Sequence, residues 1–202
     1  MQNIDDWLKN ASAVVAGGLS PGTPNSGPAT IIITAADLPV DPSTLIGASP
    51  ESLYVIRTAA GLVPPASGQT DLSVAAALEY GIRVRKARHI IQIAHNDCGI
   101  LKSLVDPDAS GTAALLQCQF FPQWVALASS SISGTIQGTD ETTRAQQCAE
   151  ELLRVGFENL MTYPWILDPV WNGQLGLHGW YIDRHEKRLR VFSPETDSFR
   201  EV

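Results

Sequence analysis

Short apolar runs alternate along the chain with a longer segment whose apolar residues have helical spacing. Residues 31–34, 53–57 and 90–94 are rich in β-branched apolar side chains, and each run is too short for a helix that packs alone. These runs predict buried strands. Between the second and third runs, residues 71–80 predict a helix that continues toward residue 85. The alternation of strand, helix and strand predicts a parallel α/β sheet, with residues 90–94 as its central strand.

The N-terminal residues differ in pattern from this predicted sheet. Residues 4–16 place apolar side chains at helical spacing and predict an amphipathic arm helix that ends at Gly17-Gly18. Residues 19–30 are rich in Pro, Gly and Ser and have no periodicity, which is typical of a linker. We therefore expect an arm helix and linker over residues 1–30 and a single α/β domain over residues 31–202. The apolar face of the arm needs a surface to cover, and in sheet proteins that surface is often a second subunit.

The second half of the chain predicts helices followed by antiparallel strands. Residues 109–157 have a mostly helical pattern, which is strongest over residues 141–157. Tyr163-Pro164-Trp165 is expected to end this helical region. Residues 174–182 and 189–192 then predict two antiparallel strands joined by a charged turn.

The composition fits a domain with a full core and no nucleic-acid surface. Hydrophobic residues make up 44% of the 202 residues. The formal net charge is −7, and Lys and Arg do not gather into the basic face that phosphate groups need. No apolar run approaches the length of a membrane span. We expect small molecules or other protein chains as partners, with no nucleic acid and no membrane.

The cysteines and the N-terminus favour a cytoplasmic protein. Cys98, Cys118 and Cys148 are odd in number and irregular in spacing, so they do not suggest a disulfide framework. A reducing compartment suits them better. The first residues are acidic and lack the basic start and apolar segment of a secretory signal.

An imidazole and a thiol follow the central strand directly, in the segment HNDCG of residues 95–99. Ligands bind outside the carboxyl ends of the strands in open parallel sheets, so His95 and Cys98 are candidates for a ligand-binding site. Two other interpretations remain open. Cys98 could be a small buried hydrophobe beside a hydrogen-bonded His95, or a nucleophile for which His95 is the base.

Other polar and aromatic residues are assigned structural roles. We expect His89 to lie at the far end of its strand from the HNDCG segment, His178 to pack within its strand, and His185 to be solvated. Arg57, at the end of a buried strand, is expected to pair with a carboxylate at a subunit interface. Packing on helices is expected of a further set: Cys118, Gln119, Phe120, Phe121, Trp124 and Cys148.

Four segments in order resemble the β-class carbonic anhydrases. They are LYVIRTAAG at 53–61, AALEYGI at 76–82, HNDCG at 95–99 and LGLHGWYIDRHEKRLRVFSPETDSF at 175–199. The resemblance implies a mostly parallel sheet flanked by helices, an N-terminal arm helix, C-terminal antiparallel strands, and a homodimer or higher oligomer. It also implies zinc, held by a Cys from a first-loop C-x-D-x-R motif and by the His and Cys of H-x-x-C.

Carried over residue by residue, the resemblance gives an incomplete zinc site. His95 and Cys98 match two ligands, and Asp37 matches the aspartate of the first loop. Ala35 stands where the family has its ligand Cys, and Pro39 where it has the Arg that clamps the aspartate. Without that clamp, Asp37 could turn onto the metal and complete an Asp/His/Cys/water site. The resemblance therefore implies zinc that is weakly held or absent, with Asp37 as both third ligand and catalytic residue.

Asp37 also has a plainer interpretation, as the cap of the helix after its loop, although Asp41 and Ser43 are better placed for that role.

Two functions follow from the resemblance. The first is a lyase that hydrates CO2, or a related small molecule such as COS or CS2, by a metal-bound water, with weak or absent activity of the usual kind. The second is a non-catalytic homologue, a pseudoenzyme, kept for a structural, assembly or binding role.

Overall fold

A computed structural model describes residues 4–16, 29–66, 72–105, 117–124, 126–127, 136, 138 and 140–202. The predicted linker up to residue 28, and the helical pattern expected over residues 109–116 and 128–135, lie outside the described residues. None of the helices in the described ranges has the length and apolar character needed to span a bilayer.

Six strands form one mixed sheet in the order β2-β1-β3-β4-β5-β6. The strands are β1 (Thr30–Ala35), β2 (Leu53–Thr58), β3 (His89–His95), β4 (Gly176–Asp183), β5 (Arg188–Ser193) and β6 (Ser198–Glu201). The first four run parallel, and β5 and β6 are antiparallel to their neighbours. The predicted parallel sheet, its central strand and the C-terminal antiparallel pair are confirmed.

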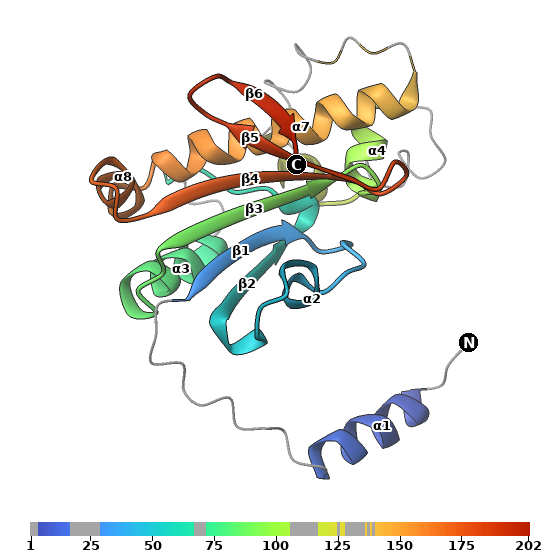
Figure 1. The fold of residues 1–202 in the computed structure, drawn as a ribbon. Helices are drawn as coiled ribbons and strands as arrows, with labels where there is room; N and C mark the ends of the chain where they lie inside the picture. Colours follow the sequence, from blue (N-terminus) through green and yellow to red (C-terminus); the bar gives the residue numbers. More distant parts are fainter. Residues whose placement is uncertain are drawn as a thin grey trace.

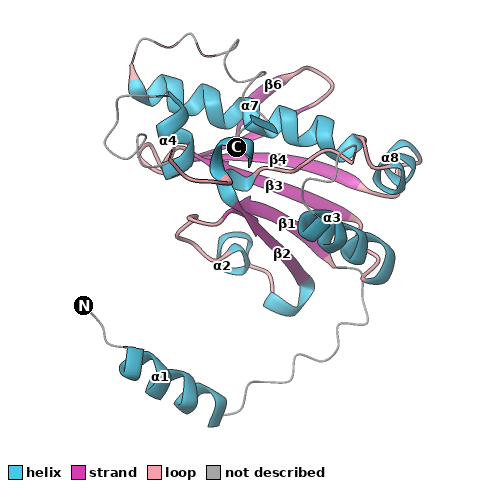
Figure 2. Cartoon of the chain, turned by 180° about the vertical axis from the view of Figure 1, so that it is seen from behind, coloured by secondary structure: helices cyan, strands magenta, loops and turns pink. Residues whose placement is uncertain are grey.

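The helices gather mainly on one face of this sheet, where α3, α4, α7 and α8 lie in Figures 1 and 2. The helical elements are α1 (Ile4–Ala16), α2 (Pro42–Ile46), η1 (Pro50–Ser52), η2 (Ala59–Gly61), α3 (Leu72–Glu79), the π-helical η3 (Tyr80–Val84), α4 (Gly99–Val105), α7 (Glu141–Met161) and α8 (Pro164–Trp171). The predicted arm helix is present as α1, which lies apart from the sheet in Figure 1.

The central strands β1 and β3 bury side chains on both faces, as strands inside parallel sheets do. Beneath α3 and α8 one cluster contains Ile31, Ile33, Val74, Leu78 and Ile166. Beneath α4 and α7 a second contains Ala35, Ala94, Cys98, Cys148 and Leu152. A third cluster contains the intervening strand residues Ile32, Ile91 and Ile93 together with Leu38.

Two predictions about elements were wrong or incomplete. Tyr163-Pro164-Trp165 does not end the helical region, because Tyr163 is the N-cap of α8 and Pro164 is its first residue. Proline is well suited to that position, where the amide proton has no helical partner. The strand β6 was not predicted, because its sequence SFRE has no apolar run.

The expected packing of residues 118–124 on a helix was also partly wrong. Cys118 is exposed and lies outside the described helices, and Phe120 is 73% exposed. Cys148 is fully buried in α7, as expected.

Candidate metal centre

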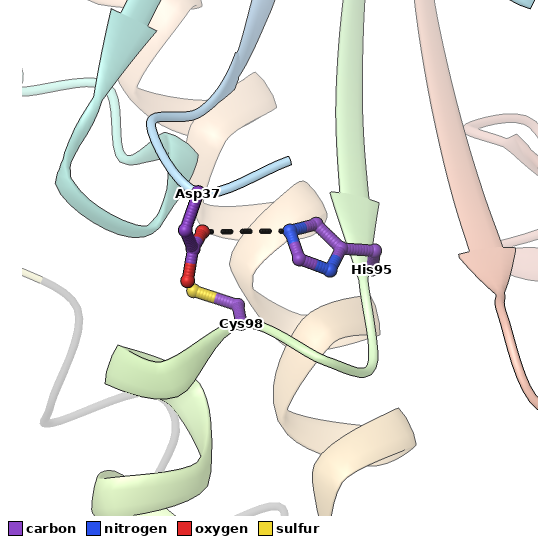
Figure 3. Close-up of side chains that lie close together, drawn as sticks. All are labelled: Asp37, His95 and Cys98. Carbon is purple, nitrogen blue, oxygen red and sulfur yellow. Dashed lines mark ion pairs between the residues drawn. The ribbon is translucent and has the colours of Figure 1, made fainter. Parts of the chain in front are cut away.

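Three of the predicted site residues meet at the carboxyl end of the sheet. Asp37 lies in the loop after β1, His95 is the last residue of β3, and Cys98 directly precedes α4. Because β1 and β3 are parallel neighbours, both strands deliver their following loops to the same edge. One ligand atom from each of Asp37, His95 and Cys98 lies within 4.8 Å of the other two (Figure 3).

The carboxylate of Asp37 bridges the other two residues. Its Oδ1 lies 3.5 Å from His95 Nε2, and its Oδ2 accepts a hydrogen bond of 2.9 Å from the amide of Gly99. Figure 3 shows the Asp37 carboxylate between the imidazole of His95 and the sulfur of Cys98. The capping role considered for Asp37 falls to Asp41, whose side chain accepts from the amide of Ser43.

Burial leaves the imidazole of His95 in need of a hydrogen-bond or metal partner. His95 and Cys98 are each 1% exposed, whereas the side chain of Asp37 is half exposed. In the part of the chain that the structure describes, neither ring nitrogen of His95 has a hydrogen-bond partner. A buried polar group without a partner costs about 1–3 kcal/mol. An ion bound at Nε2 would give one of the two ring nitrogens a partner, and nitrogen, thiolate and carboxylate are zinc ligands, so this donor set fits zinc.

His95 and Cys98 differ in their protonation state when no metal is bound. Burial lowers the pKa of His95 against the opposing effect of Asp37, so its imidazole is neutral and has a lone pair for a metal. Burial raises the pKa of Cys98 to about 12. Without a metal Cys98 is therefore a thiol at neutral pH. This counts against Cys98 as a nucleophile, because the thiolate is the reactive form.

The loop that carries Asp37 is held by Arg57 of β2. The Arg57 guanidinium donates to the carbonyl oxygen of Leu38 at 3.1 Å and to those of Ala35 and Val40 at 3.4 Å. Within this chain Arg57 thus binds backbone carbonyls, where a carboxylate partner was expected. The contacts lie on both sides of Asp37 and restrain the backbone from which it projects.

A buried glutamine helps to hold η2 near the start of the loop that carries Asp37. Gln92, which is fully buried in β3, donates from Nε2 to the carbonyl of Gly61 at 3.1 Å. Gly61 has φ +70° and lies so close to β1 that a Cβ there would be 3.1 Å from the amide nitrogen of Ala35. Half-buried Trp124 donates from Nε1 to the carbonyl of neighbouring Ala59 at 2.9 Å. These contacts fix η2 against the start of the first loop.

Residues after β3 and β4 form a second set of contacts that sequence reasoning missed. Asn96 donates to buried Asp183 at 2.9 Å and accepts from the amide of Arg184. Asp97 accepts from Lys102 and Arg184. The signal in the sequence that could have predicted these contacts is the presence of polar residues at the ends of two neighbouring strands.

The remaining histidines lie away from this centre or at its rim. His185 is mostly exposed, as expected, and its Nε2 lies 3.1 Å from Asp97 Oδ1. As expected, His89 is the first residue of β3 and lies at the opposite end of that strand from His95. Its ring contacts that of His178 in the neighbouring strand β4.

Sequence comparisons identify related proteins. The family model for carbonic anhydrase matches residues 30–189. Beta carbonic anhydrase 5, chloroplastic, from Arabidopsis thaliana is 31% identical over 160 residues, covering 77% of this chain and 51% of that protein. Beta carbonic anhydrase 6, mitochondrial, from the same plant is 30% identical over 185 residues, covering 84% and 58%. This chain thus spans just over half the length of these relatives. Since their names place them in organelles, the cytoplasmic location stays a prediction.

Solved structures have the same fold. The β-carbonic anhydrase CcaA matches with a TM-score of 0.83 at 20% identity, over 100% of both chains. One of two tetrameric β-carbonic anhydrases from Sordaria macrospora matches with a TM-score of 0.73 at 21% identity, over 94% of this chain and 97% of that one. The family match over most of the sequence, the named relatives and the shared fold agree, and the chain belongs to the β-carbonic anhydrase family.

Proposed function

We propose that this chain is a weak zinc-dependent hydratase in which Asp37, His95 and Cys98 hold the metal. The observation that carries the proposal is the approach of the three donor groups to within 4.8 Å of one another. Ala35, at the position of the family's ligand Cys, offers no donor atom. Asp37 is then the residue that supplies the missing ligand and the second negative charge.

The chain's own residues define what this site can do. When bound, zinc would supply the Lewis acidity that lets water add to the carbon of CO2, COS or CS2 near neutral pH. The amide of Gly99 orients one oxygen of Asp37 and leaves the other directed at His95. A carboxylate that serves as a ligand is less able to accept a proton from the reacting water. Activity below that of a site with separate ligand and base is therefore expected.

Zinc content and hydration rate test this proposal together. The purified full chain should take up close to one zinc per chain, and stopped-flow measurement should detect slow CO2 hydration above background. Asp37→Asn should lower zinc affinity at least about tenfold, because it removes a charged ligand. Asp41→Asn is the matched control, since Asp41 lies in the same loop and asparagine also caps a helix.

The same measurements decide against the proposal if zinc stays well below one per chain and hydration stays at background. Ala35→Cys with Pro39→Arg then asks whether the pocket is otherwise intact. Zinc binding and hydration in that double variant, with neither in the natural chain, would identify a non-catalytic homologue that lost its site through these two residues.

An assembly role, which a non-catalytic homologue would also keep, is the second candidate, and the arm helix favours it. The α1 side chains of Ile4, Leu8, Val14 and Val15 are each more than 60% exposed. Apolar surface of this kind is typical of an interface. We infer that α1 packs on a second copy of the chain in a homodimer or higher oligomer, and that residues 31–202 form the domain it joins.

Light scattering during gel filtration tests the assembly separately from the metal. Leu8→Asp with Val15→Asp should shift the full chain toward the monomer, whereas Lys9→Asp, a polar change on the same helix, should leave the oligomer unchanged. An unchanged mass for the apolar variants would exclude the arm as the interface.

A further inference from the structure

Two histidines form a pair at the end of the sheet opposite the candidate zinc centre. His89 Nδ1 and His178 Nε2 lie 3.1 Å apart, at the start of β3 and near the start of β4. The register pairs His89 with Gly176 and Ile91 with His178, so both imidazoles project from the same face of the sheet. His89 is exposed and His178 is half-buried, which leaves the pair open to solvent.

The glycine beside the pair provides the space that it occupies. A Cβ at Gly176 would lie 2.9 Å from His178 Nε2, closer than real Cβ contacts allow, and 3.0 Å from His89 Nδ1, which is unusually tight. Any side chain at position 176 would push the two ring nitrogens apart. The absence of a side chain there is what permits their approach.

We propose that His89 and His178 form a two-histidine site for a divalent transition-metal ion, separate from Asp37, His95 and Cys98. With metal–nitrogen bonds of about 2.0–2.1 Å, a nitrogen separation of 3.1 Å corresponds to an angle of roughly 100° at the metal, between the square-planar and tetrahedral values. Water would complete the coordination on the exposed side.

Local chemistry selects the kind of ion. Burial and the neighbouring His89 lower the pKa of His178, so its imidazole is neutral and can donate a lone pair. Lys86 and Arg88 line the adjoining 740 Å³ cavity together with His89, and no carboxylate is among the described residues that line it. Hard cations such as Mg²⁺ and Ca²⁺ need carboxylate oxygen and are disfavoured. Ions that prefer imidazole, namely Ni²⁺, Cu²⁺ and Zn²⁺, are the expected ligands.

A hydrogen bond between the two rings is the competing explanation for the 3.1 Å separation. It requires a proton on one of the two facing nitrogens, and a neutral imidazole can move that proton to its other nitrogen. Metal binding at the pair therefore needs no net loss of a proton. Only a binding measurement separates the two explanations.

Calorimetric titration of the untagged full chain with Ni²⁺ tests the site. We expect the titration to show Ni²⁺ binding. Absorbance spectra of the same mixture should show no thiolate-to-metal charge-transfer band, because Cys98 is not a ligand at this site. His89→Asn and His178→Asn should each weaken this Ni²⁺ binding at least about tenfold, since the second bond of a chelate forms at high effective concentration. His185→Asn, which changes another exposed histidine, should have no effect.

Two variants guard against a folding artefact. His89 is exposed, so His89→Asn should fold even where His178→Asn does not. Gly176→Ala keeps both imidazoles but separates their nitrogens. It should also abolish the Ni²⁺ binding that occurs without thiolate absorption. Unchanged Ni²⁺ binding in His89→Asn and Gly176→Ala would overturn the proposal, as would Ni²⁺ binding that always carries the thiolate absorption.

Discussion

Gly156→Ala is predicted to destabilise the protein, although replacing glycine by alanine in an exposed helix usually stabilises a protein. Gly156 lies in the middle of α7 and faces fully buried Gln92 of β3. A Cβ at position 156 would lie 2.1 Å from Gln92 Oε1 and 2.3 Å from Gln92 Nε2. Atoms cannot approach so closely, so the glutamine side chain or the helix must move.

The size of the effect follows from three contributions. Alanine gains about 1 kcal/mol of helix propensity over glycine. Overpacking a tight core costs about 1–3 kcal/mol. Displacing Gln92 breaks its bond to the carbonyl of Gly61 and leaves buried polar groups unpaired, which costs about 1–3 kcal/mol more. The free energy of unfolding should therefore fall by about 1–5 kcal/mol.

Urea unfolding of four proteins checks this account: the natural chain, Gly156→Ala, Gln92→Ala and the double variant. The shorter side chain at position 92 makes room for the new methyl group, so the two changes should be strongly non-additive. An unfolding midpoint for Gly156→Ala at or above that of the natural chain would refute the reasoning. Additive effects in the double variant would also refute it.

The contact has a consequence for the metal centre. Gln92 holds the carbonyl of Gly61, and Gly61 packs against the amide of Ala35 at the start of the loop that carries Asp37. Gly156→Ala should thus lower zinc affinity as well as stability, at a distance from the ligands. Gln92→Glu, which keeps the shape but replaces the donor amide with an acceptor, should lower zinc affinity in the same direction.

Three further predictions concern the surroundings of the site. Arg57→Met should weaken zinc binding several-fold in a chelator competition, because the Asp37 loop loses its bonds to the guanidinium, and it should lower the free energy of unfolding by about 1–3 kcal/mol. The hydrogen bond from Lys102 lowers the pKa of Asp97 below its ordinary value of 3.8, so this carboxylate stabilises the fold above that pH and less as the pH falls. The stability difference between the natural chain and Asp97→Asn, measured by urea unfolding, should be largest near neutral pH and close in acid. Trp124→Phe should cost about 1 kcal/mol, since it removes a hydrogen bond to η2.

The centre of the sheet could be predicted because strands β1 and β3 are buried on both faces. Burial on both faces produces continuous apolar runs such as Ile31–Ile33, which periodicity detects directly. The edge strand β6 has no such run. Its Phe199 packs on Phe192 of β5, and both rings lie against Arg154 of α7. These contacts join distant parts of the chain and leave no local pattern in the sequence.

The same distinction applies to the site. His95 and Cys98 are close in sequence and follow an apolar strand, so their proximity could be predicted from the sequence. Asp37 was identified only through the family resemblance. The supporting bonds join residues far apart: Gln92 and Gly61 are 31 positions apart, and Asn96 and Asp183 are 87 apart. Such pairs follow from strand order and register, which the sequence alone did not determine.

In the proposed zinc site, charge would explain why one thiolate and one carboxylate could serve where the motif that the family resemblance implies has two thiolates. A divalent ion there would be neutralised by Asp37 together with Cys98 in its ionised form. Zinc binding would then require Cys98 to lose a proton, because burial raises the pKa of Cys98 to about 12 when no metal is bound. Zinc affinity of the natural chain should therefore rise about tenfold per pH unit near neutrality. Ala35→Cys adds a second thiol to deprotonate and should steepen that dependence toward about a hundredfold, whereas equal slopes would mean that position 35 does not reach the metal.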